Sequence, residues 1–137
     1  MGILVDSTVF IEAERNGLSA RQALTAIALR FPGEVAAISV ITLTELAHGA
    51  ARADTASRRA SRYRFIQELI VAVPALPVTA AAALKAGEID GEAKSKGIHL
   101  ALSDLLIGAT ALELGYKLAT ANLRHFQMIP GLTVVSV

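Results

Sequence analysis

Short apolar runs rich in valine, isoleucine and leucine alternate along this chain with longer segments of helical periodicity. We expect the runs to be strands, at residues 2–6, 35–40, 76–78, 117–121 and 132–136. Strands that alternate with helices favour a parallel sheet with helices packed on both faces. The pattern therefore predicts an α/β fold, although it does not give the order of the strands in the sheet.

Helix-start and helix-stop signals divide the segments between these runs. Ser19 and Gln22 have capping-box spacing, Thr79 is a candidate cap, and Gly97 is a typical stop. The expected helices cover residues 7–14, 19–30, 42–51, 55–72, 79–96 and 103–114. A length of 137 residues suits one domain, and no linker or repeat divides it, so we expect residues 1–137 to form a single domain.

Composition excludes several classes of protein. The chain has no cysteine, so disulfides and thiolate metal sites are excluded. No apolar stretch approaches the ~20 residues that span a bilayer, and the first residues lack the basic start of a signal peptide. We therefore expect a cytoplasmic protein that does not act at a membrane. Charged residues make up 18% of the chain, below the ~25% of a typical domain, which indicates apolar surface covered by another chain.

Three carboxylates lie where an isolated charge is costly. Asp6 ends an apolar run, Glu45 follows another, and Asp104 opens a third, with no lysine or arginine within several residues of any of them. Ligand sites in parallel sheets gather at the carboxyl ends of the strands, so these acids can meet in space. Three acids that meet need a cation, and a divalent ion with oxygen ligands is the natural candidate.

Each acid also has a purely structural interpretation. Asp6 can cap the helix that follows it. Thr42 and Glu45 have the spacing of a capping box. Ser103 can cap the next helix while Asp104 interacts with the helix dipole. None of these interpretations excludes a functional role.

The motifs taken together resemble the PIN-domain ribonucleases, and among them the VapC-type toxins of bacterial toxin–antitoxin pairs. The resemblance covers nearly the whole chain. It rests on five segments, which are Ile3–Ser7, Ser39–Leu46, Ser103–Ala111, Leu118–Phe126 and Ile129–Leu132.

This resemblance implies a three-layer α/β/α sandwich on a five-stranded parallel sheet. It implies a metal site of Asp6, Glu45 and Asp104, with residues 120–126 as a fourth wall. Many family members have a further acid in that wall. This chain has Asn122 there, which we include among the catalytic candidates, and His125 stands where an acid is often found.

The resemblance also implies a function and partners. The chain would be an endoribonuclease in which Mg²⁺ or Mn²⁺ activates a water that hydrolyses an RNA phosphodiester. It would form a homodimer and bind a VapB-type antitoxin. Candidates for substrate contact are Ser7, Thr120, Arg124 and His125, together with five arginines between residues 52 and 64. The alternative is a PIN-fold module that binds RNA or a protein partner without cutting.

Overall fold

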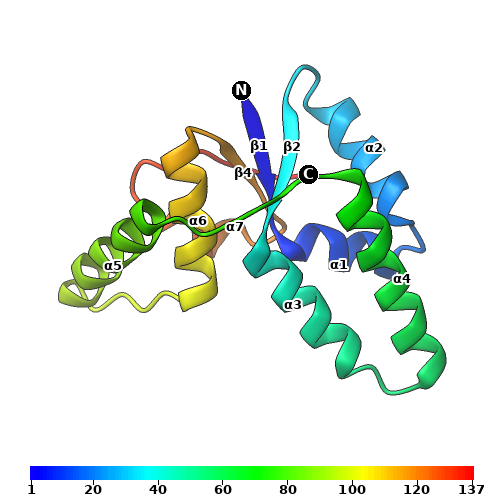
Figure 1. Cartoon of the computed structure of the whole chain (residues 1–137). Helices are drawn as coiled ribbons and strands as arrows, with labels where there is room; N and C mark the ends of the chain where they lie inside the picture. The colour runs from blue at the N-terminus through cyan, green and yellow to red at the C-terminus, as the bar shows by residue number, and fades with distance from the viewer.

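The computed structural model describes residues 1–137 and contains one five-stranded sheet in the order β3-β2-β1-β4-β5. All four strand pairings are parallel, as predicted. The strands are β1 (Gly2–Val5), β2 (Val35–Ser39), β3 (Ala75–Leu76), β4 (Lys117–Ala119) and β5 (Val134–Val135). The central strand β1 pairs with β2 and β4, so residues that follow these three strands share one edge of the sheet (Figure 1).

Seven helices connect and cover the strands. They are α1 (Ser7–Arg15), α2 (Ala20–Arg30), α3 (Val40–Ala51), α4 (Ala56–Ala72), α5 (Ala80–Ser95), α6 (Leu102–Leu114) and α7 (Leu123–Gln127). The predicted capping box at Ser19 and Gln22 is present, and Thr79 accepts a hydrogen bond from the Ala82 amide. Gly97 has φ +75°, a conformation that glycine adopts without strain.

Alternating residues of the strands divide the interior into two cores. Ile3 and Val5 face one side of the sheet, where α1, α2, α3 and α4 pack. Leu4 faces the other side, where α5, α6 and Phe126 of α7 pack. This alternation is the period-two pattern of a strand that is covered on both faces. The result is the predicted α/β/α sandwich, with α5 and α6 on one side of Figure 1 and α1, α2 and α4 on the other.

The structure differs from the expected helices at the starts of α3 and α6 and in one additional helix. Helix α3 begins at Val40 rather than Thr42, because Ser39 at the end of β2 caps it by accepting a bond from the Ile41 amide. Helix α6 begins at Leu102, one residue before the predicted start. The short helix α7 was not predicted at all.

None of the seven helices combines the length and the hydropathy needed to cross a bilayer.

Candidate active site

Asp6 lies at the centre of the carboxyl edge of the sheet. It follows β1 directly, its amide donates to the Ala119 carbonyl at 2.9 Å, and only 2% of its surface is exposed. Two hydroxyls donate to its Oδ2, from Thr8 at 2.6 Å and from Thr120 at 2.9 Å. These bonds fix the carboxylate in one orientation without neutralising its charge.

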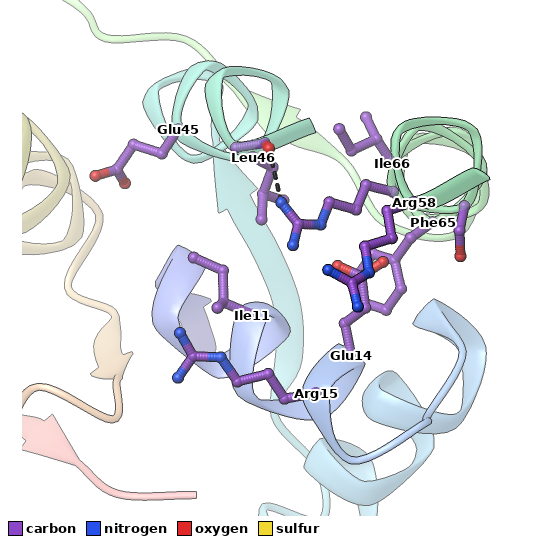
Figure 2. Close-up of a pocket in the computed structure, with 11 residues that line it drawn as sticks. Ile11, Glu14, Arg15, Glu45, Leu46, Arg58, Phe65 and Ile66 are labelled. Atoms are coloured by element: carbon purple, nitrogen blue, oxygen red, sulfur yellow. Dashed lines mark hydrogen bonds between the residues drawn. The ribbon is translucent and has the colours of Figure 1, made fainter. Parts of the chain in front are cut away.

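Glu45 reaches this edge from α3. Its Oε1 accepts a hydrogen bond of 2.9 Å from the Ser7 hydroxyl, which joins α3 to the first residue of α1. Figure 2 shows the Glu45 side chain extending away from Arg58 on α4. The acid is half-buried and makes no ion pair with a lysine or an arginine.

Asp104 enters from the opposite layer, on the first turn of α6. Its Oδ2 lies 3.5 Å from Nδ1 of His125, and its side chain is 15% exposed. The same Nδ1 lies 2.8 Å from Nδ2 of Asn122, so the two candidates from the fourth wall contact each other. The site therefore combines residues from α1, α3, α6 and the segment that follows β4.

The capping interpretation fails for Asp6 and Glu45, and the cap expected from Ser103 beside Asp104 is also absent. Asp6 occupies the N-cap position of α1, yet its side chain makes no capping hydrogen bond. Glu45 lies beyond the first turn of α3, so the expected capping box with Thr42 does not form. Helix α6 has no side-chain cap, which excludes that role for Ser103, although Asp104 does lie in the first turn, where the dipole favours an acid.

The electrostatics of the site disfavour negative charge. Burial raises the pKa of Glu45, and the charges of Asp6 and Asp104 raise it further, against an opposing hydrogen bond from Ser7. Burial also raises the pKa of Asp104, followed by the charge of Asp6, while His125 opposes the rise. The acids thus repel one another in a place where the protein supplies no compensating lysine or arginine.

These donors suit a hard divalent ion. Carboxylate oxygens are the ligands that Mg²⁺ and Mn²⁺ prefer, and uncompensated negative charge is what such an ion would relieve. No group of three acidic or histidine side chains is gathered closely enough to ligate one ion directly. Mg²⁺ commonly binds through one or two carboxylates and keeps several waters, so the arrangement still fits it. The assignment of Asp6, Glu45 and Asp104 as ligands stays a prediction.

The predicted basic contacts lie apart from one another. Arg124 is exposed on α7, beside the exposed His125. On α4, Arg58 forms a bidentate pair with Asp54, with bonds of 2.9 and 2.8 Å. Arg62 donates to the Gly49 carbonyl at 2.9 Å (dashed line in Figure 2). The five arginines of residues 52–64 are therefore not equivalent.

Comparisons with known proteins agree with this geometry. The PIN domain family matches residues 3–131. The chain belongs to the PIN-domain family. Ribonuclease VapC1 of Rickettsia felis is 31% identical over 137 residues, which cover 100% of this chain and 97% of that protein. Within the PIN family, this domain is therefore a member of the VapC ribonuclease group.

Solved structures support the same assignment. The VapBC2 complex of Rickettsia felis bound to a promoter DNA fragment has a TM-score of 0.83 at 22% identity, covering 100% of this chain and 99% of that one, and shows a shared fold. A toxin–antitoxin complex from Klebsiella pneumoniae has a TM-score of 0.69 at 28% identity, covering 98% of this chain and 96% of that one.

Two features of this PIN domain site were not predicted. Thr8 bonds both Asp6 and the Ala121 amide, the latter at 3.0 Å, and so ties α1 to the segment after β4. Its only sequence signal was a hydroxyl residue two positions after a strand-ending acid. Arg15, at the end of α1, lines the same pocket as Glu45, and nothing in the sequence indicated this.

Proposed function

We propose that this PIN domain is a metal-dependent endoribonuclease and the toxin of a toxin–antitoxin pair. The observation that supports the proposal is that Asp6, Glu45 and Asp104 lie near enough for their charges to act on one another, and that none of them makes an ion pair with a lysine or an arginine. A buried set of like charges costs folding energy, so a functional reason must retain it. Membership of the VapC group supplies the reaction class.

When bound, Mg²⁺ or Mn²⁺ would supply an activated water and would polarise a phosphoryl oxygen of the RNA. Asp6, Glu45 and Asp104 would hold the ion, at least in part through its bound waters. The hydroxyls of Thr8 and Thr120 keep the Asp6 carboxylate in position, and the hydroxyl of Ser7 does the same for Glu45. Attack by water leaves a 5′-phosphate and a 3′-hydroxyl and does not use the 2′-hydroxyl as a nucleophile.

The fourth wall contributes contacts without adding negative charge. Asn122 and His125 pair with each other beside Asp104. In this proposal Asn122 contacts the metal-bound water and His125 contacts the substrate phosphate. Arg124 is exposed on α7 and would bind the RNA backbone farther along. A neutral wall suits one tightly held ion better than two.

We also propose two protein partners. A VapB-type antitoxin would cover the face of α2 and α4, where Leu29 is 78% exposed and Val71 is 85% exposed. A second copy of the chain would pack on the opposite layer, where Leu84 of α5 and Leu102 of α6 are 71% and 69% exposed. The Klebsiella pneumoniae complex supports the antitoxin proposal.

The competing function is an RNA-binding or partner-binding PIN module that does not cut. It is favoured by one observation: the Asn122–His125 pair supplies no carboxylate to the fourth wall, where the family resemblance led us to expect a further acid.

Cleavage assays on the purified chain separate the two functions. With Mg²⁺ or Mn²⁺ we expect structured and unstructured RNAs to be cut to 5′-phosphate products, and we expect EDTA or Asp6→Asn to abolish cutting. Absence of cleavage with either ion across these RNAs would favour the binding module. Equal cleavage by the Asp6→Asn protein would identify a contaminating nuclease.

A further inference from the structure

A hollow of about 320 Å³ lies between α1, α3 and α4, beside the carboxylate site. Its volume lies in the ~300–1,000 Å³ range of small-ligand pockets. Glu45 belongs both to this hollow and to the metal site, so the two are continuous across a single side chain. Apolar side chains of Ile11, Leu46 and Phe65 line part of the hollow (Figure 2).

Three arginines also line the hollow, and they differ in whether an acidic side chain already pairs with them. Arg58 is bound by both carboxylate oxygens of Asp54, and both side chains are largely exposed. Arg15 makes no ion pair. Arg62 is half-buried, and one nitrogen of its guanidinium donates a hydrogen bond to the Gly49 carbonyl, which holds the group in place. Arg15 and Arg62 are therefore the two cations free to bind an anion there.

We propose that this hollow is a subsite for one nucleotide of the RNA strand next to the scissile phosphodiester, with Arg15 and Arg62 binding its phosphate. The proposal rests on the proposed function, because it places the reacting phosphate at Asp6 and Glu45. Glu45 borders both the carboxylate site and the hollow. An RNA strand whose reacting phosphate lies beside Glu45 would therefore place its next nucleotide in the hollow. Guanidinium groups recognise phosphate through paired N–H donors, and the apolar lining can face a sugar or a base.

Glu14 offers a variant that should change RNA affinity in the opposite direction from the arginine variants. It lines the same hollow, and burial raises its pKa while the charge of Arg62 lowers it. An acid in a phosphate subsite opposes binding. Removing its charge should therefore strengthen RNA binding, whereas removing an arginine should weaken it.

The test measures the affinity of the full chain for a labelled single-stranded RNA in EDTA, over a series of salt concentrations. We expect Arg15→Ala to weaken binding roughly tenfold and to reduce the slope of log affinity against log salt by about 0.7, the value for one lost phosphate contact on a single strand. We expect the same of Arg62→Gln and tighter binding by Glu14→Gln. Arg62→Lys, which keeps the charge, should retain most of the affinity.

Two matched controls lie on α4. Arg58→Ala removes an arginine that is already paired, and Arg64→Ala removes an exposed arginine outside the hollow. Both should change affinity much less than Arg15→Ala. In cleavage assays with metal, Arg15→Ala should raise KM and leave kcat unchanged, as expected for lost uniform binding.

Several outcomes overturn the subsite. These are no RNA binding by the unmodified chain, equal effects of Arg15→Ala and Arg64→Ala, or no tightening by Glu14→Gln. Loss of affinity for a protein partner with unchanged RNA affinity would also overturn it and assign the hollow to that partner. If the variants change RNA affinity as expected but the chain cleaves no RNA, the nuclease proposal is refuted and the subsite stands. If the chain cleaves RNA but the variants do not change affinity as expected, the subsite is refuted and the nuclease proposal stands.

Discussion

The acids at the two ends of the central strands have pKa values shifted in opposite directions. At the amino end, Glu34 precedes β2 and Lys117 begins β4, and their side chains meet at 2.8 Å across the start of β1. The hydrogen bond from Lys117 holds the pKa of Glu34 below its usual value. At the carboxyl end, burial and mutual repulsion raise the pKa of Glu45 and of Asp104.

This difference is informative because both ends belong to the same three strands. The fold supplies a lysine for one acid at the amino end and no lysine or arginine for three acids at the carboxyl end. The ion pair with Lys117 favours the charged form of Glu34 in the folded chain. Burial and repulsion disfavour the charged forms of Glu45 and Asp104, and a bound cation would relieve that cost. A site that lowers stability when empty is typical of catalytic centres.

The largest expected effect is on the rate of RNA cleavage, which should depend on the acids at the carboxyl end of the strands and not on Glu34 at the amino end. Asp104→Asn should lower the rate of RNA cleavage about 100-fold or more, since it removes a proposed ligand of the metal. Glu34→Gln should leave the rate unchanged, because it alters an ion pair at the far end of the sheet. Initial rates on one RNA at fixed metal concentration measure both. Equal losses in the two variants would indicate a general effect on folding and remove the distinction.

The next effect concerns the cation itself. A metal that binds only the folded chain stabilises it by about 2.7 kcal/mol when present at 100 times its Kd. We expect Mg²⁺ or Mn²⁺ to raise the Tm of the unmodified chain and of Glu34→Gln alike, and to raise that of Asp104→Asn much less. Thermal unfolding with and without EDTA measures this. An equal rise in all three proteins would place the ion outside the carboxylate site.

The sequence predicted the sheet and most helices because their signals are local. Apolar runs, caps such as Ser19 and stops such as Gly97 act within a few residues. The start of α3 was misplaced for the same reason. Thr42 and Glu45 have the spacing of a capping box, but Ser39 caps the helix directly at the end of β2, and the Thr42 hydroxyl is left buried without a partner.

The candidate site was only partly predictable because its contacts join distant segments. The acids were identifiable, since a carboxylate beside an apolar run is conspicuous in a sequence. The hydrogen bond that the Ala121 amide donates to the Thr8 hydroxyl spans 113 positions, and no local pattern indicates it. The neighbourhood of Arg15, Glu45 and Arg62 depends on how α1, α3 and α4 pack, which the sequence pattern did not specify.

The smallest expected effect is on how the free energy of unfolding depends on pH without metal. Removing the acids at the carboxyl end and removing Glu34 at the amino end should change this free energy in opposite directions. An acid whose folded-state pKa is raised costs stability as pH rises from its unfolded value, which is 4.5 for Glu45 and 3.8 for Asp104, through its folded value. At pH 7 in EDTA, the double variant Glu45→Gln, Asp104→Asn should thus be more stable than the unmodified chain, by a margin that solvent screening keeps small because both side chains are only half-buried. The gap should close as pH falls below these values.

Glu34 provides the control of opposite sign for this last measurement. Its folded-state pKa is lowered, so its contribution is present above 4.5 and is lost as pH falls through the folded value. Glu34→Gln should therefore be less stable than the unmodified chain at pH 7 and approach it in acid. Urea unfolding at several pH values measures both gaps. A double variant that is less stable than the unmodified chain at pH 7 without metal would show that the acids at the carboxyl end stabilise the fold, and the contrast between the two ends would then lose its basis.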